Sequence, residues 1–298
     1  MKPLSYLVLL TLCTLIIGCK TEKKDSNKEE TSSTKETIEK KSLTKIWETD
    51  TLLTTCESVF YDKSNDVLYV SNIGGVPPDA QDNDGFISKV STSGEILELR
   101  WVENIDAPKG MGMVGSNLYV TNIDELVAID TKSGSITDRI PVDGSVFLND
   151  ITTSNDGTVY LSDSRGNKIF TYKDNLMSTW MEQDDFGGPN GLLSQGGKMM
   201  VAAFGSGNFM SIDIASKAID ITSTGLKGGD GLVPVGNDYM VSNWNGEVYF
   251  VKADGSKSKL LDTKTEKLNS ADIEFIAAKN LLLVPTFFGN TVAAYELK

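Results

Sequence analysis

A polar or charged residue lies 13 to 15 positions before the last residue of each of six short β-type runs. The runs are LYVSN, LYVTN, VYLSD, MMVAA, YMVSN and LLVPT, and their last residues are spaced 50, 41, 40, 40 and 43 apart. The polar residues are Glu57, Lys109, Asn149, Asn190, Asp230 and Asp272. Carboxylate and amide oxygens are hard ligands, so the Glu, Asn and Asp members of this set would suit Ca²⁺ or Mg²⁺ if the fold brings them together.

The same residues also have a plainer interpretation, in which they only solvate a water-filled channel and cap loop backbone. Without a cation, carboxylates crowded in a channel would repel each other, and one of them would take up a proton. Lys109 and Asp272 could either bind a ligand or pair with each other across the channel. Phe204, Trp244 and Phe287 each follow a strand end and could shape the mouth of a pocket.

The repeat predicts the fold that must position these residues. A period near 40 residues, built from alternating apolar and polar runs, indicates one small antiparallel sheet per repeat, and six such sheets make an all-β, six-bladed β-propeller with four strands per blade. Residues 43 to 48 have no partner of their own, so we expect them to supply the outermost strand of the last blade and close the ring. In such a ring the first strand of every blade lines the channel, and residues at one phase converge.

The N-terminus has the pattern of an export signal. Lys2 is followed by a mostly apolar stretch that ends in LIIGC at Cys19, and this pattern resembles a lipobox. The resemblance implies a signal peptide over residues 1 to 18, lipid on Cys19, and a protein anchored in the cell envelope, periplasmic or at the cell surface, through its acyl chains. Residues 20 to 42 are rich in Lys, Glu, Ser and Thr, so we expect a disordered tether before a propeller over residues 43 to 298.

Composition restricts the partners and the chemistry. From residue 43 onward the chain carries 20 basic and 35 acidic residues, a net charge of −15, which argues against nucleic acid as a partner. The chain contains no histidine, so Ser-His-Asp triads, Cys-His dyads and His-ligated metals are excluded. Cys56 is the only thiol left in the predicted domain, and we interpret it as a small buried spacer rather than a nucleophile.

The acidic segment 79 to 85, DAQDNDG, imitates part of a calcium loop. Its first and twelfth ligand positions would be Ala80 and Ser91, where Asp and Glu are needed. We therefore interpret it as an insertion in a hairpin, and this insertion also explains the first spacing of 50.

Four local motifs, in this order and spacing, resemble the regucalcin and gluconolactonase family of six-bladed propellers. The motifs are Glu57-Ser58, Leu148-Asn149-Asp150, Gly188-Pro189-Asn190-Gly191-Leu192 and Gly229-Asp230-Gly231-Leu232. The resemblance implies one divalent cation held by Glu57, Asn190 and Asp230, with Asn149 on the substrate or on metal-bound water. Ca²⁺ is the preferred ion, with Mg²⁺, Mn²⁺ or Zn²⁺ as alternatives. Asp230 is also implied as the general base.

The chain departs from the resembled family at positions that contact substrate. Phe147 stands where the family often has an Arg that holds a sugar acid, and Ser58-Val59-Phe60 replaces the usual Gly-Pro-aromatic sequence. Two hypotheses follow. The first is a metal-dependent hydrolase of a lactone or related cyclic ester, with a small molecule as substrate and a sugar lactone as one candidate. The second is a non-catalytic propeller of the cell envelope that binds a sugar-like ligand or a protein partner.

Overall fold

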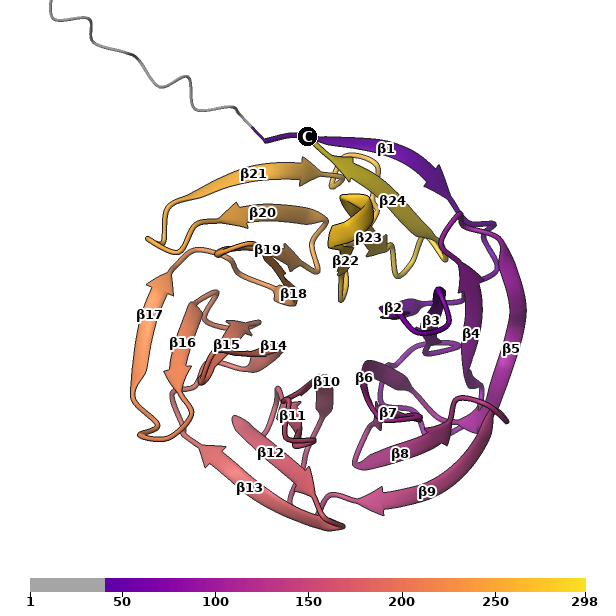
Figure 1. Ribbon diagram of the computed structural model, residues 1–298, viewed down its shortest axis with the longest axis horizontal. Helices are drawn as coiled ribbons and strands as arrows, with labels where there is room; N and C mark the ends of the chain where they lie inside the picture. Colours follow the sequence, from indigo (N-terminus) through magenta and orange to yellow (C-terminus); the bar gives the residue numbers. More distant parts are fainter. Residues whose placement is uncertain (1–40) are drawn as a thin grey trace, which may run out of the picture. The chain divides into compact units, whose positions relative to one another are not determined.

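The six predicted repeats fold into six four-stranded antiparallel sheets, arranged as blades around a central axis (Figure 1). This computed structural model describes residues 41–298, so the predicted signal peptide, Cys19 and most of the predicted tether lie outside the described residues. The predicted all-β, six-bladed propeller is confirmed. Within residues 41–298 the only helix is the short 3₁₀ helix η1 (Ala277–Lys279), and no helix there is long and apolar enough to cross a membrane.

The strands are ordered in each blade from the axis outward. Blades one to three are β2 (Cys56–Asp62), β3 (Val67–Asn72), β4 (Gly85–Ser91) and β5 (Ile96–Ile105); β6 (Pro108–Val114), β7 (Asn117–Asn122), β8 (Glu125–Asp130) and β9 (Ser135–Pro141); β10 (Leu148–Thr153), β11 (Val159–Asp163), β12 (Lys168–Lys173) and β13 (Leu176–Glu182). Blades four to six are β14 (Pro189–Gln195), β15 (Lys198–Ala203), β16 (Phe209–Asp213) and β17 (Ile219–Ser223); β18 (Gly229–Val235), β19 (Asp238–Asn243), β20 (Glu247–Val251) and β21 (Lys257–Asp262); β22 (Glu274–Ile276), β23 (Leu281–Pro285), β24 (Val292–Leu297) and β1 (Leu43–Glu48).

The ring closes as predicted, because β1 from the start of the described chain pairs antiparallel with β24 at its end. Leu43 lies opposite Leu297, and Glu48 lies opposite Ala293. The last blade is thus completed by strands from both ends of the domain, and β24 is not left as an open edge. Figure 1 shows β1 outside β24 where the two ends of the domain meet.

Most of the core is divided among the six junctions between neighbouring blades rather than gathered at one centre. At the junction of blades six and one, for example, Val59 and Val70 pack with Leu283 and Val292. Cys56 belongs to this cluster, its thiol donates a hydrogen bond to the carbonyl of Thr291, and burial raises its pKa to about 12. The prediction that Cys56 is a buried spacer is confirmed.

Candidate functional site

A β-bulge in the inner strand of each of the first five blades places the predicted site residue. In blade five, Gly229 pairs with Asn243 and Leu232 pairs with Val241, so Asp230 and Gly231 together oppose a single residue of β19. The same register shift occurs where β2, β6, β10 and β14 pair with their second strands. Because a bulge turns side chains out of the regular alternation, it can aim them into the channel.

A serine near the end of several β-type runs explains how the bulges of those blades are held. The Asp150 amide donates a hydrogen bond to Oγ of Ser162 over 2.8 Å, and the Gly231 amide donates to Oγ of Ser242 over 2.8 Å. In blade one the Ser58 amide donates to Oγ of Ser71 over 3.0 Å. A hydroxyl from the second strand thus satisfies an amide that the bulge removes from the ladder.

Glycine next to a site residue allows neighbouring inner strands to approach closely. A Cβ added at Gly191 would lie 1.9 Å from the carbonyl oxygen of Asp230, and one added at Gly110 would lie 2.5 Å from Cα of Asp150. Neither position can hold a side chain without moving backbone. The Asn190-Gly191 and Lys109-Gly110 pairs therefore combine a pocket-lining side chain with the close contact that brings the next blade to the pocket.

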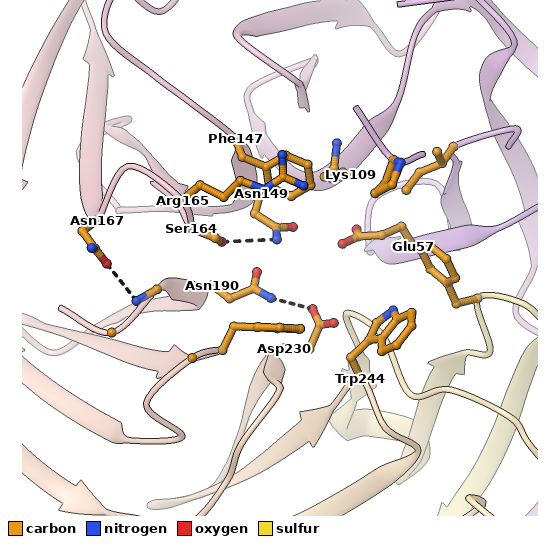
Figure 2. Close-up of a pocket in the computed structure, with 17 residues that line it drawn as sticks. Glu57, Lys109, Phe147, Asn149, Ser164, Arg165, Asn167, Asn190, Asp230 and Trp244 are labelled. Carbon is orange, nitrogen blue, oxygen red and sulfur yellow. Dashed lines mark hydrogen bonds between the residues drawn. The ribbon is translucent and has the colours of Figure 1, made fainter. Parts of the chain in front are cut away.

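The bulges open into a pocket of about 550 Å³ at the start of the inner strands (Figure 2). Five of the six predicted residues line it, namely Glu57, Lys109, Asn149, Asn190 and Asp230. All five are at least nine-tenths buried. Phe204, Trp244 and Phe287 also line it, as the sequence suggested, with the Trp244 and Phe287 rings 5.6 Å apart in an edge-to-face contact. One wall of the pocket is thus apolar.

Two oxygens of this pocket are buried without a hydrogen-bond partner among the described residues. They are Oε2 of Glu57 and Oδ1 of Asn190. The Asn190 side chain donates a hydrogen bond from Nδ2 to Oδ1 of Asp230 over 3.2 Å. This bond uses the amide nitrogen and leaves the amide oxygen of Asn190 available. A buried polar atom without a partner costs about 1–3 kcal/mol.

The electrostatics of the pocket favour a positive charge near the carboxylates. Burial, together with the charges of Asp230 and Asp272, raises the pKa of Glu57 well above its usual range, while Lys109 opposes this shift. Burial, together with Asp272 and Asp150, raises the pKa of Asp230 in the same way. A cation between the two carboxylates would relieve both effects, and the unpaired oxygens of Glu57 and Asn190 would serve as its ligands.

The residues present therefore fit a divalent cation by chemistry. The set contains two carboxylates and one amide, and amides count among the oxygen donors that Ca²⁺ accepts. No group of three Cys, Asp or Glu side chains suited to a metal occurs within residues 41–298, so any cation here depends on the Asn190 amide. Asn149 lies in the same pocket, with its Nδ2 donating to Oγ of Ser164 over 3.3 Å.

Asp272 differs from its predicted placement. Oγ of Ser242 donates to the carbonyl of Ala271 over 2.7 Å, just as Oγ1 of Thr121 donates to the carbonyl of Asn149. Ala271, not Asp272, is therefore the blade-six residue equivalent to Asn149. The last run ends 15 positions after Ala271, and the count of 14 that selected Asp272 is one short.

Asp272 instead lines a second cavity farther along the inner strands, together with Asp150 and Glu274. Its carboxylate accepts a hydrogen bond from Oγ of Ser58 over 2.5 Å, and burial raises its pKa to about 7. Nζ of Lys109 donates a hydrogen bond to the carbonyl of Ala107. Lys109 and Asp272 therefore do not form the pair that the sequence left open.

Sequence reasoning missed three polar residues that line the pocket, Ser164, Arg165 and Asn167. All three belong to the connection between β11 and β12, outside the inner-strand positions that the repeat selects. Asn167 accepts a hydrogen bond from the Gly188 amide over 2.9 Å. The available signal was the Ser-Arg-Gly-Asn sequence directly after the VYLSD run, because residues that follow the ends of other runs, such as Phe204 and Trp244, were expected at the pocket mouth.

The fold and the pocket define a six-bladed β-propeller with a buried polar pocket at the start of its inner strands. No family model matches the chain, and no curated protein matches it. A solved gluconolactonase from Xanthomonas campestris is similar, with a TM-score of 0.60 and 14% identity over 82% of this chain and 86% of that one. Virginiamycin B lyase from Staphylococcus aureus has a TM-score of 0.60 and 13% identity over 86% and 99%. A chain of a nidogen/laminin complex has a TM-score of 0.56 and 19% identity over 67% and 77%. At these identities the likeness shows the fold alone.

Proposed function

We propose that this protein is a divalent-metal-dependent hydrolase of a lactone or related cyclic ester, similar in activity to a gluconolactonase. One observation carries the proposal: Oε2 of Glu57 and Oδ1 of Asn190 are buried without a partner among residues 41–298, and both lie in the same pocket as Asp230. A similar propeller of known structure is a gluconolactonase, which supports this choice of reaction.

Glu57, Asn190 and Asp230 would hold the cation, with Ca²⁺ preferred and Mg²⁺, Mn²⁺ or Zn²⁺ as alternatives. When bound, the cation supplies Lewis acidity that polarises an ester carbonyl. The apolar wall formed by Phe204, Trp244 and Phe287 would exclude bulk water from the lactone ring.

Asp230 would act as the general base. It would take a proton from water as the water oxygen bonds to the lactone carbonyl carbon. The ring C–O bond would then break, and the ring oxygen would take up that proton from Asp230 to give a hydroxy acid. The Asn190 amide, hydrogen-bonded to Asp230, would hold this carboxylate in place. Asn149, oriented by Ser164, would donate to or accept from the substrate.

A lactone panel assayed with and without each cation tests this function. We expect turnover that a chelator abolishes, and a loss of about 100-fold or more in kcat for Asp230→Asn, since an amide cannot accept the proton. Asp220→Asn, an exposed change on β17, is the matched control. Cation binding with no lactone turnover would instead support a non-catalytic propeller that binds a sugar-like ligand, the candidate that Phe147 favours by standing where the resembled family has Arg.

We also propose that the protein is anchored in the cell envelope by lipid on Cys19. The support is the apolar stretch that ends in LIIGC, followed by a strongly polar segment. Its partners would then be a membrane, reached through Cys19, and a small-molecule substrate reached through the pocket.

A further inference from the structure

Lys109 brings a buried positive charge to the pocket without an acidic partner. Its Nζ donates to the carbonyl of Ala107 over 3.0 Å, and no ion pair within residues 41–298 includes it. Burial lowers the pKa of this ammonium group to about 8, and the nearby Glu57 and Asp79 charges oppose the shift. An ammonium group has three donors, so Lys109 still has donors for an anion.

Arg165 brings a second positive charge to the same edge of the pocket. Its guanidinium carbon lies 4.1 Å from the centre of the Phe147 ring, and Nζ of Lys109 lies 4.5 Å from the same centre. Figure 2 shows the three side chains together, across the pocket from Asp230. Glu57 and Asp230 thus supply negative charge to the pocket, while Lys109 and Arg165 supply positive charge.

A carboxylate of the chain itself already pairs with one of these two cations, Arg165. Asp79 belongs to the long connection between β3 and β4, and its Oδ2 lies 2.5 Å from Nη1 of Arg165. The positive charge of Lys109 also helps to lower the pKa of Asp79. The neighbouring Pro78 lines the pocket, so this connection places Asp79 at the pocket rim.

We propose that Lys109 and Arg165 form a subsite for the carboxylate of an organic acid, which Asp79 occupies when no ligand is bound. A carboxylate fits because the planar guanidinium binds it through paired hydrogen bonds, and because the group now present is a carboxylate. The choice of a lactone with a free carboxylate as the substrate rests on the proposed function. Such a substrate would place its acid group at Lys109 and Arg165 and its ring near Glu57 and Asp230.

Binding of D-gluconate and D-sorbitol to the full protein, measured by calorimetry with a chelator present, tests the subsite without any cation. The two probes differ in the carboxylate, so gluconate should bind and sorbitol should not. Arg165→Gln should weaken gluconate binding about tenfold or more, the factor expected for a lost charge-assisted hydrogen bond. Asp79→Asn should tighten it by about twofold to fivefold, because it removes the competing carboxylate of an exposed ion pair.

Arg100→Gln is the matched control, since Arg100 also stacks on a ring, Phe86, and pairs with an acid, Glu103, but does not line the pocket. It should leave gluconate affinity unchanged. Equal affinity for the two probes, no gluconate binding, or weaker binding by Asp79→Asn would overturn the subsite.

Hydrolysis of D-glucaro-1,4-lactone, which has a free carboxylate, and of neutral D-galactono-1,4-lactone separates the two proposals. If both are hydrolysed equally and Arg165→Gln changes neither, the subsite is wrong and the hydrolase stands. If neither is hydrolysed but gluconate binding still depends on Arg165, the hydrolase is wrong and the subsite stands.

Discussion

The Asn190 amide nitrogen donates to Oδ1 of Asp230 across the junction of blades four and five, over 3.2 Å. This bond fixes the direction of the Asn190 side chain, so that its oxygen cannot also face Asp230 and is left without a partner. Gly191 makes the bond geometrically accessible, because it lets the two inner strands approach. The pairing of Asn-Gly with Asp-Gly in successive repeats thus leaves one buried amide oxygen without a hydrogen-bond partner among the described residues.

Added cation should stabilise the fold. Ca²⁺ at about 100 times its dissociation constant should raise the free energy of unfolding by roughly 2.7 kcal/mol, and a chelator should reverse the rise in melting temperature. Glu57→Gln should reduce this rise, because an amide binds Ca²⁺ more weakly than a carboxylate does. Without cation it should not destabilise the protein, because it removes a buried charge near Asp230.

Glu98→Gln is the control for this prediction, since Glu98 is an exposed partner of Lys89 on β5. It should keep the full cation-dependent rise measured by differential scanning calorimetry. Equal rises in Glu57→Gln and in the wild type would remove Glu57 from the ligand set.

Gly191→Ala should be among the most costly single-methyl additions in this protein. Its Cβ would lie 1.9 Å from a backbone oxygen, and we expect a loss of about 3 kcal/mol, the upper part of the range for overpacking. Gly196→Ala is the comparison, because no atom lies within 4 Å of the added Cβ and only a φ of +59° penalises it, by about 1–2 kcal/mol. Urea denaturation measures both. Similar losses would show that the strands can move apart at Gly191.

Much of the fold could be predicted from the sequence, because the repeat carries its own signals. The period of the β-type runs gave the six blades, and the unpartnered residues 43 to 48 gave the closing strand β1. The serine near the end of several runs, as at Ser162, also had a structural meaning, since its hydroxyl holds the bulge of the inner strand.

The candidate site was predictable only where the repeat was regular. Counting back from the end of each run selected the pocket-lining residue in blades one to five. In blade six it selected Asp272, one residue after the equivalent position, which is Ala271. The count has no way to detect a one-residue change in the turn between two strands. Arg165 and Asp79 were not selected as site residues because they lie in connections whose path the periodicity does not determine, and they meet across 86 positions of sequence.

Glu247 should make the protein sensitive to acid. Burial alone would raise its pKa, but hydrogen bonds from Lys259, Lys264 and Asn243 lower it from the ordinary 4.5 to about 2. Because the folded-state pKa is depressed, this contribution is fully present above about pH 4.5 and is lost as the pH falls toward 2. Glu247→Gln should therefore lower the free energy of unfolding at pH 7 by about 2–3 kcal/mol.

Urea denaturation at pH 7, 4.5 and 3 measures this effect, and the difference between wild type and Glu247→Gln should shrink as the pH falls. Glu103→Gln, which breaks an exposed pair with Arg100, is the control and should change stability by less than about 1 kcal/mol at every pH. A constant difference from pH 7 to pH 3 would show that Glu247 acts through packing rather than through its charge.

Cys19→Ala should release the protein from the membrane. If lipid on Cys19 is the anchor, the variant should move to the soluble fraction or keep its uncleaved signal, because no other acyl attachment site is predicted. Cys13→Ala is the control, since Cys13 lies within the apolar stretch and is expected to be removed with the signal peptide. Fractionation followed by immunoblotting measures both variants. A Cys19→Ala protein that is processed and remains with the membrane to the same extent as the wild type would rule out lipid at this residue.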